Sequence, residues 1–217
     1  MNIVITGAPG SGKGSRTPII EKMFNIPTIS TGNMLRAEVE KGTELGLAAK
    51  GIMDSGGLVS DEIIIGMLAT RIKESDCRTG FILDGVPRTI VQAEMMKAAG
   101  IKIDKLIVVE VPNEVIVARL SGRRVCSACS EPYHVEDKKP IQEGICDKDG
   151  GELVTRKDDK PEVIKSRLET YHSETKPIID FYKDEASVSY IDANRPFGEA
   201  EKAVREAFAP KSKEMIK

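Results

Sequence analysis

Short apolar runs alternate with longer helical stretches along most of the chain. The apolar runs have the length of strands and lie at residues 2–6, 81–84, 105–111 and 188–191, with a weaker one at 27–29. The helical stretches lie between them, at about 13–24, 32–54, 61–75, 89–99, 113–122, 161–185 and 197–208. Continuous apolar runs are typical of strands that are buried on both faces. The alternation therefore predicts an α/β protein with a parallel sheet covered by helices.

One segment, from about Arg123 to Asp159, interrupts this pattern. It has no long helical period and is rich in Cys, Pro, Gly, Asp and Lys. We interpret it as an insert with a small architecture of its own. The tail at residues 210–217 reads PKSKEMIK and is polar, so we expect it to be frayed.

The first loop carries a phosphate-binding motif. Residues 7–13 read GAPGSGK, which fits G-x-x-x-x-G-K, and they follow a predicted strand and open a predicted helix. Glycines let backbone N–H groups turn toward phosphate oxygens, and the N-terminus of the helix adds positive potential. Lys13 supplies a charge that reaches the β- and γ-phosphates. We therefore expect a nucleotide site here, rather than a glycine-rich turn without a ligand.

The position after Lys13 is unusual for this motif. Many phosphate-loop enzymes hold Mg²⁺ with a Ser or Thr there, whereas this chain has Gly14, followed by Ser15. Metal binding must use other groups. We expect Asp84, at the end of run 81–84, to hold Mg²⁺ through water, because Mg²⁺ keeps several water ligands. The alternative is an aspartate that only stabilises a turn or caps a helix.

Composition and charge narrow the function classes. The chain has 217 residues, of which 40% are apolar and 30% charged, and its net charge is −2. This suits one core domain with one or two inserts, and the acidic balance argues against a nucleic-acid partner. No apolar run approaches the roughly 18 residues of a membrane span, and the N-terminus lacks the basic start of a secretory signal. We expect a cytoplasmic protein without a membrane partner, in which disulfides are rare.

Six motifs together resemble the adenylate kinase family. They are GAPGSGKG at 7–14, STGNMLR at 30–36, LDGVPRT at 83–89, GRR at 122–124, TRKDD at 155–159 and RLETYH at 167–172. They follow the family's order and spacing over essentially the whole chain. The resemblance implies a phosphate-loop kinase with a five-stranded parallel sheet and helices on both faces. It also implies the reversible reaction of Mg-ATP with AMP to give two ADP, carried out by a monomer.

The resemblance also implies a division of the chain. Residues 30–59 would form an insert that closes over AMP, and residues 122–159 a lid that closes over ATP. The core domain would then comprise residues 1–29, 60–121 and 160–217.

The resemblance assigns the phosphate contacts mainly to arginines, whose planar fork grips phosphate oxygens at two points. The residues it implies for catalysis are Lys13, Asp84, Arg88, Arg123, Arg156, Asp158, Asp159 and Arg167. Those for ATP are Gly10, Ser11, Gly12, Lys13, Gly14, Ser15, Arg119, Arg123, Tyr133 and Arg195. Those for AMP are Thr31, Arg36, Val59, Gly85, Arg88, Gln92, Arg156 and Arg167.

Alternatives remain for several of these residues. Arg119 and Arg123 are four residues apart at a predicted helix end, where they repel each other unless a polyanion binds. They could instead form a solvated basic end that complements the helix dipole. Asp158 and Asp159 would orient arginines and close the lid, or cap the helix that begins near Pro161, and both roles can hold at once. An ordinary exposed glutamine is the alternative for Gln92, which otherwise offers adenine a donor and an acceptor.

Three positions depart from the family pattern. Asn33 stands where the family usually has Asp, Val86 replaces the usual Phe, and Gly57 lies where many members have Lys. The first removes a charge near the closing lids, and the second thins the apolar packing behind Arg88. We expect these changes to affect lid closure and turnover rate more than the type of reaction.

The cysteines of the insert have the spacing of a metal site. Cys126 and Cys129 form C-x₂-C, and Cys146 and Asp149 follow. Zinc accepts thiolates and a carboxylate together, and a closed four-ligand site is structural. The alternatives are a disulfide between two cysteines, free thiols, His134 as a competing ligand, or iron in place of zinc. Cys77 lies outside this set, and we expect a buried thiol there.

Other function classes remain to be compared with the leading hypothesis. The nearest is a kinase of another monophosphate, such as UMP, CMP or GMP. A GTPase-like switch is disfavoured because no N-K-x-D motif follows the phosphate loop. A zinc-ribbon module that binds nucleic acid is disfavoured by the acidic balance and by the 4% of aromatic residues, since strand binding needs stacking surfaces.

Overall fold

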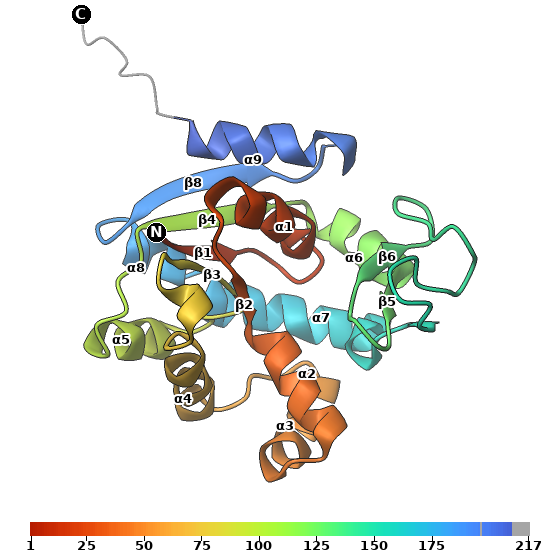
Figure 1. Cartoon of the computed structure of the whole chain (residues 1–217), viewed down its shortest axis with the longest axis horizontal. Coiled ribbons are helices and arrows are strands. Elements are labelled where there is room, and N and C mark those ends of the chain that lie inside the picture. The colour runs from red at the N-terminus through yellow and green to blue at the C-terminus, as the bar shows by residue number, and fades with distance from the viewer. Residues whose placement is uncertain (196, 210–217) are drawn as a thin grey trace, which may run out of the picture.

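A five-stranded parallel sheet forms the centre of the protein (Figure 1). The computed structural model describes residues 1–195 and 197–209. The strands are β1 (Asn2–Thr6), β2 (Thr28–Ser30), β3 (Phe81–Asp84), β4 (Lys105–Glu110) and β8 (Ser187–Asp192), in the order β2-β3-β1-β4-β8. Every pairing among them is parallel. The predicted fold class is therefore confirmed.

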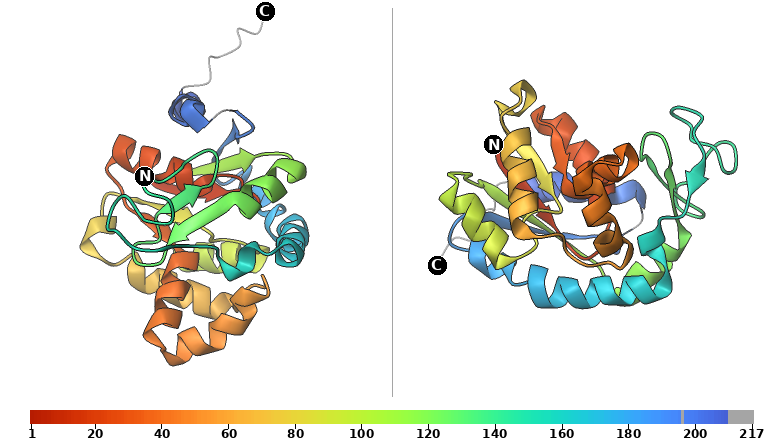
Figure 2. Two further views of the ribbon diagram at one scale, coloured as in Figure 1. Left: turned by 90° about the vertical axis from the view of Figure 1, so that its right-hand side faces the viewer. Right: turned by 90° about the horizontal axis from the view of Figure 1, so that it is seen from below.

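Alternate residues of each strand point to opposite faces of the sheet, and helices cover both faces (Figure 2). On one face, Ile3 and Ile5 pack with Ile20 and Val204 of α1 (Lys13–Phe24) and α9 (Ala200–Phe208). On the other, Val4 lies in a second cluster with apolar residues of α4, α5 and α8. These helices are α4 (Asp61–Arg71), α5 (Ile90–Ala98) and α8 (Ile178–Tyr182).

A third apolar cluster supports the phosphate loop. Ile116 and Leu120 of α6 (Asn113–Gly122) pack with Ile164 and Leu168 of α7 (Pro161–Thr170), and Ala8 of the loop joins them. Because parallel strands all end at the same edge, the loops after β1, β2, β3 and β8 converge there. The fold thus places the phosphate loop among the other loops at the carboxyl edge of the sheet.

The predicted helix 32–54 is wrong as a single element. The structure has α2 (Thr31–Lys41) and α3 (Glu44–Asp54), separated by Gly42 in the left-handed conformation at φ 67°. The next residue, Thr43, caps α3 by accepting a hydrogen bond from the Gly46 N–H at 3.0 Å. The glycine and the cap together turn the chain, so that α3 folds back against α2 (Figure 1).

Three other predicted helices are divided or shortened. Helix 161–185 is α7, a π-helical turn at Tyr171–Thr175 and then α8, which begins after Pro177, a residue with no N–H for a helical hydrogen bond. Helix 61–75 ends at Arg71, before a 3₁₀ turn at Ser75–Cys77. Helix 197–208 begins with a 3₁₀ turn. The predicted frayed tail, 210–217, lies outside the described residues.

The small architecture predicted for the insert is a three-stranded sheet. Strands β5 (Arg123–Cys126), β6 (Pro132–His134) and β7 (Leu153–Val154) pair in antiparallel fashion in the order β6-β5-β7. A 3₁₀ turn at Lys157–Asp159 then leads into α7. The insert stands to one side of the main sheet (Figures 1 and 2). Across the part of the chain that the structure describes, no helix has the length and apolar character to cross a membrane.

Candidate active site

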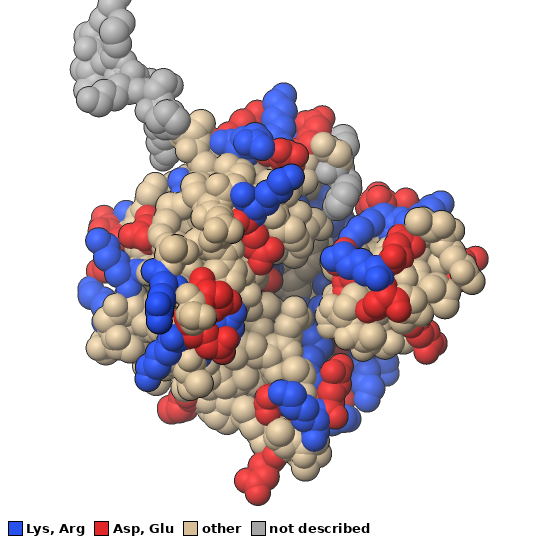
Figure 3. Space-filling view, viewed as in Figure 1, with Lys and Arg blue, Asp and Glu red and all other residues tan. Residues whose placement is uncertain are grey.

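The carboxyl edge of the main sheet opens into a cleft of about 770 Å³. Figure 3 shows the groove between the body and the insert, with Lys and Arg side chains visible inside it. The cleft is lined by nearly all the residues that the sequence singled out, from the phosphate loop, the arginines and the neighbouring strand ends. Ser11 and Asp159 are the exceptions. Their exposed fractions are 0% and 4%, and they do not reach the surface of the cleft.

Backbone conformation explains the glycines of the phosphate loop. Gly10 and Gly12 have φ of 78° and 91°, in the left-handed region that favours glycine. A Cβ atom on Gly10 would lie 2.7 Å from the Leu120 Cγ, and one on Gly12 would lie 2.6 Å from the Arg16 Nη1. The positive φ favours glycine at both positions, and at Gly10 the close approach of Leu120 in α6 excludes a side chain as well.

Lys13 is the first residue of α1, and its side chain folds back into the phosphate loop. Its Nζ donates to the Gly7 carbonyl at 2.7 Å and to the Ala8 carbonyl at 3.1 Å. Burial lowers the pKa of Lys13 to about 8; Asp84 opposes this shift, and nearby arginines, first Arg88, add to it. The lysine is thus held among other cations without an ion-pair partner among the described residues.

Two acids, the buried Asp159 and the partly buried Asp158, hold two of the arginines. Arg123 donates to both carboxylate oxygens of Asp159, and its Nε is 2.7 Å from the Asp159 Oδ2. The Arg167 Nη1 lies 2.9 Å from the Asp158 Oδ2. The N-cap of α7 is Lys160, with no side-chain cap bond. The alternative that these aspartates cap the helix is therefore wrong, and the structure shows them orienting arginines.

Other arginines in the cleft lack such partners. The Nε atoms of Arg36 and Arg156 are buried and make no hydrogen bond. Burial lowers the pKa of Arg156 to about 9, and the neighbouring Arg36 and Arg123 contribute to the shift. Burial likewise lowers the pKa of Arg88. Positive charge therefore exceeds negative charge in the cleft, which favours the binding of an anion.

The predicted repulsion between Arg119 and Arg123 is wrong. The backbone at Arg123 is extended, because α6 ends at Gly122, so the two side chains are not neighbours on one helix face. Arg119 turns instead toward the end of β8, where its Nη2 donates to the Ala193 carbonyl at 2.8 Å. The two guanidinium groups thus lie apart, that of Arg119 at the end of β8 and that of Arg123 beside Asp159.

Asp84 lies in the wall of the cleft at the end of β3. The nearest helix, α5, is capped by Thr89, whose Oγ1 accepts from the Gln92 N–H at 3.0 Å. Among the described residues, the Asp84 side chain makes no hydrogen bond. The turn and capping alternatives for Asp84 are therefore wrong, and the carboxylate remains open to a ligand in the cleft.

On the opposite side of the cleft, Thr31 and Gln92 are both 2% exposed. The Thr31 hydroxyl donates to the Gly85 carbonyl at 3.0 Å. The Gln92 Oε1 accepts from the Arg88 N–H at 2.6 Å, and its Nε2 donates to the Asp61 Oδ1 at 2.8 Å. An exposed glutamine is therefore excluded, and one donor hydrogen and one acceptor lone pair of Gln92 remain for a ligand. Val59, another predicted contact, is buried in the core beside them.

The three departures from the family pattern lie in or beside the cleft. Asn33 Oδ1 accepts from Arg36 Nη2 at 2.6 Å, so this arginine is held by a neutral group. Val86 is 1% exposed and belongs to the main core cluster. A Cβ on Gly57 would lie 3.1 Å from the Ile52 Cγ2, which is a tight contact.

Two further predicted contacts lie at the outer walls. The Tyr133 ring is 4% exposed and borders the cleft, while its hydroxyl accepts from the Asp147 N–H at 2.7 Å. The same hydroxyl is 3.5 Å from the Cys146 Sγ, so Tyr133 joins the cleft wall to the cysteine cluster. Arg195 pairs with Glu206, with 3.2 Å between Nη1 and Oε2.

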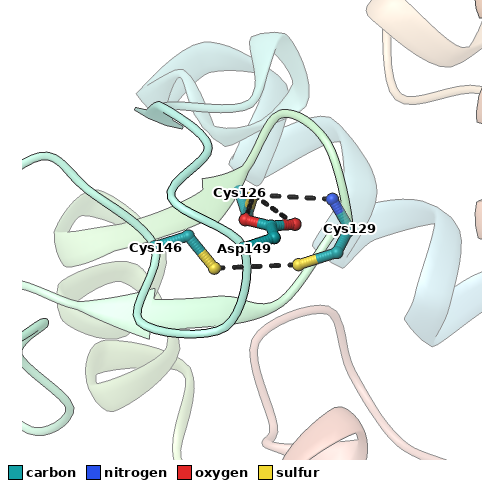
Figure 4. Close-up of side chains that lie close together, drawn as sticks. All are labelled: Cys126, Cys129, Cys146 and Asp149. Atoms are coloured by element: carbon teal, nitrogen blue, oxygen red, sulfur yellow. Dashed lines mark hydrogen bonds between the residues drawn. The ribbon is translucent and has the colours of Figure 1, made fainter.

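The predicted metal ligands gather in the insert (Figure 4). The ligand atoms of Cys126, Cys129, Cys146 and Asp149 all lie within 4.8 Å of one another. The Cys129 and Cys146 sulfurs are 3.7 Å apart, and the Cys126 Sγ is 3.2 Å from the Asp149 Oδ1. The Ala128 and Cys129 N–H groups point at the Cys126 sulfur, and Lys148 N–H points at that of Cys146.

Two alternatives for this cluster are wrong. Every cysteine in the described residues is free, so none forms a disulfide. His134 uses its Nδ1 to accept from the Glu136 and Asp137 N–H groups and is absent from the cluster. Cys77 is a buried thiol, as predicted.

Arg16 is a cleft residue that the sequence reasoning missed. It lies in α1 and borders the cleft with a side chain that is only 6% exposed. The available signal was a cation three residues after Lys13, on a helix face that otherwise carries apolar residues. Arg16 belongs to none of the six motifs, so no motif marks it as a site residue.

Comparison with known proteins agrees with this geometry. A family model described as adenylate kinase matches residues 5–187. The chain belongs to the adenylate kinase family. An adenylate kinase of Caldicellulosiruptor bescii is 50% identical over 187 residues, which cover 84% of this chain and 87% of the relative. One from Caldicellulosiruptor saccharolyticus is 50% identical over 188 residues, covering 85% and 87%.

The burial of Lys13 predicts a pH dependence of stability. The unfolded chain keeps the Lys13 proton up to a pH near 10.5, whereas the folded protein releases it near 8. Between these values the unfolded chain binds more protons, so stability rises with pH. Relative to Lys13→Gln, the free energy of unfolding of the wild type should rise by about 1.5 kcal/mol between pH 8 and 9.5. Urea titrations at both pH values measure this, and a constant difference between the proteins would contradict it.

Proposed function

We propose that this protein is an adenylate kinase that transfers the terminal phosphoryl group of Mg-ATP to AMP, reversibly, to give two ADP. The observation that carries the proposal is the excess of buried arginine and lysine charge around a phosphate loop in one cleft. Phosphoryl transfer needs alignment and charge neutralisation rather than covalent catalysis. A membership of the adenylate kinase family supports the same reaction.

At the donor end, residues 10–15 would surround the phosphates of ATP with backbone N–H groups, and Lys13 would contact the β- and γ-phosphates. The breaking of its bonds to the Gly7 and Ala8 carbonyls would release it for this contact. Arg119, Tyr133 and Arg195 would border the nucleoside. Asp84 fits a water-bridged Mg²⁺, because it is an open carboxylate in the cleft. When bound, Mg²⁺ neutralises phosphate charge.

At the acceptor end, Arg36 and Arg88 would bind the phosphate of AMP. Thr31, Val59 and Gly85 would face the ribose and adenine. The remaining donor and acceptor of Gln92 would meet the edge of the base, while its bonds to Arg88 and Asp61 fix its orientation. Gln92 supports adenine as the base because it is buried in a fixed orientation and keeps one donor and one acceptor for the edge of the base.

Between the two ends, Arg123, Arg156 and Arg167 would surround the transferring group. Asp158 and Asp159 would hold two of them in place through the ion pairs described above. Residues 30–59 and 122–159 would close over the nucleotides and exclude water, so that ATP is not hydrolysed. Both sites lie within one chain, which is consistent with a monomer.

We also propose that the cysteine cluster holds a structural zinc ion. Three sulfurs and one carboxylate oxygen within 4.8 Å suit the tetrahedral coordination of zinc. The Gly151 N–H donates to the Asp149 Oδ1 at 2.9 Å, which fixes the orientation of this carboxylate beside the three sulfurs. The apolar cluster of the insert contains only Cys126, Tyr133, Cys146 and Leu153, too few to stabilise it alone.

The first test of the function is a coupled assay with Mg-ATP and each of AMP, UMP, CMP and GMP. AMP should be phosphorylated at least about 100-fold more efficiently than the others, because a site that hydrogen-bonds one base leaves polar groups unpaired with another. A preference for a different monophosphate would move the assignment to that nucleotide. The absence of turnover with every acceptor would contradict the proposed activity.

Arg88→Ala should lower kcat by at least about 100-fold, because it removes a charged donor that would align and neutralise the acceptor phosphate of AMP. Its melting temperature should stay close to that of the wild type, since the residue is held mainly by the Gly85 carbonyl. Arg78→Ala, which removes an exposed arginine outside the cleft, is the matched control and should retain full activity. Near-wild-type turnover of Arg88→Ala would show that the assigned role is wrong.

Metal analysis tests the cysteine cluster. The purified protein should contain about one zinc per chain by mass spectrometry, and chelation should lower its melting temperature. Cys129→Ser should lose the metal, whereas Cys77→Ala should keep it, because Cys77 lies outside the cluster. If the protein instead contained about one iron per chain, the metal assigned to the cluster would be iron rather than zinc. Metal-free protein with an unchanged melting temperature after chelation would contradict a metal site.

A further inference from the structure

Arg16 is a buried cation at the edge of the cleft that no part of the proposed reaction uses. Its side chain folds back along α1 toward the phosphate loop, where its Nη1 donates to the Gly12 carbonyl at 3.0 Å. Only 6% of the residue is exposed. Long cationic side chains are rarely buried to this extent unless they are paired. We therefore expect the Arg16 guanidinium to have an anionic partner.

The protein itself supplies little compensation for this charge. The Arg16 Nε is buried without a hydrogen-bond partner, and within the described residues no carboxylate forms an ion pair with its guanidinium. Burial lowers the pKa of Arg16, the nearby Arg119 lowers it further, and Asp192 opposes the shift. A guanidinium has five N–H donors, and here the structure gives it one acceptor. Arg16 itself lies in the lining of the cleft.

The neighbours of Arg16 indicate which part of the cleft it serves. The charges that act on Lys13 are Asp84, Arg88, Arg167 and Arg123, which surround the transferring centre. Those that act on Arg16 are Arg119 and Asp192, from α6 and the end of β8. Arg16 therefore lies on the same side of the phosphate loop as Arg119, whose side chain reaches the end of β8 through its bond to the Ala193 carbonyl.

We propose that the Arg16 guanidinium binds the α-phosphate of the donor nucleotide. This deepens, and rests on, the proposed function. The α-phosphate is the anionic group nearest the nucleoside, and a planar guanidinium matches phosphate oxygens better than it matches a ribose hydroxyl or a neutral base. Because the α-phosphate does not change charge during transfer, the contact strengthens ATP binding equally in the ground and transition states. Arg16 then recognises a nucleotide by its phosphate chain rather than by its base.

The test compares Arg16→Gln with Lys22→Gln, which removes an exposed cation from the same helix outside the cleft. Arg16→Gln should raise KM for ATP about tenfold, in line with the loss of one charged hydrogen bond. Its kcat and its KM for AMP should change less than about twofold. Calorimetric binding of ATP without AMP should weaken by the same factor, and this readout does not depend on turnover.

A second measurement identifies the group that Arg16 contacts. The two diastereomers of ATP with sulfur on the α-phosphate present different atoms to Arg16. The ratio of their kcat/KM values should shift toward one in Arg16→Gln, and also in Arg16→Lys, which keeps the charge but loses the fork. If Arg16→Gln does not fold, the diastereomer ratio of Arg16→Lys decides the question.

Three outcomes would overturn the proposal. An unchanged affinity for ATP, with a lower melting temperature, would make Arg16 a purely structural residue of the loop. An unchanged diastereomer ratio with an altered preference between ATP and GTP would place the contact at the base. An equal rise of KM for ATP and AMP would indicate a general distortion of the cleft. Failure of the proposed function is distinct from these, because the wild type would then show no turnover.

Discussion

Mutual repulsion among buried cations at the carboxyl edge of the sheet is the constraint around which this structure is arranged. Arg156 is destabilised by burial and by the charges of Arg36 and Arg123, and Lys13 by burial and by Arg88. Such an arrangement persists only where the surrounding fold holds it. The parallel sheet does so by bringing its strand ends together, and the glycines of the phosphate loop allow the backbone to join them. The protein is thereby organised to bind a polyanion before the anion arrives.

The insert depends on the same charges. Arg123 begins β5 at one end of the insert and Asp159 closes its last turn at the other, so their ion pair ties the base of the insert together. Tyr133 spans the insert from the cleft wall to the Cys146 sulfur. Lys157, at the base of the insert, lies 3.6 Å from Asp54 of α3 across the cleft. Arg123 therefore both lines the cleft and fixes the base of the insert.

Much of this architecture could be predicted from the sequence. Buried parallel strands are continuous apolar runs, so β1, β3 and β4 were placed correctly, and the phosphate loop followed from its glycines and Lys13. The break at Gly42 was missed because a glycine within a helical period does not by itself show whether the helix ends there. The partners of Asp159 were left open because residues that are 36 positions apart meet only through the fold.

Arg16 illustrates a different limit of prediction from the sequence. A single arginine in an amphipathic helix is ordinarily solvated, and only its burial, its unpaired Nε and its proximity to Arg119 set it apart. None of these properties can be read from spacing. The cysteine cluster is the opposite case, since the spacing of C-x₂-C, Cys146 and Asp149 predicted a candidate ligand set, and the fold brings those side chains together.

The most direct test of a cleft built for phosphate is the thermal stabilisation given by ATP, inorganic triphosphate and adenosine at equal concentration and constant ionic strength. A ligand at 100 times its Kd stabilises the folded state by about 2.7 kcal/mol. Compensation of buried cations predicts that ATP raises the melting temperature most, that triphosphate alone raises it clearly, and that adenosine has little effect. Equal stabilisation by adenosine and ATP, with none from triphosphate, would show that the base rather than the phosphate chain provides the binding energy, and would contradict the account.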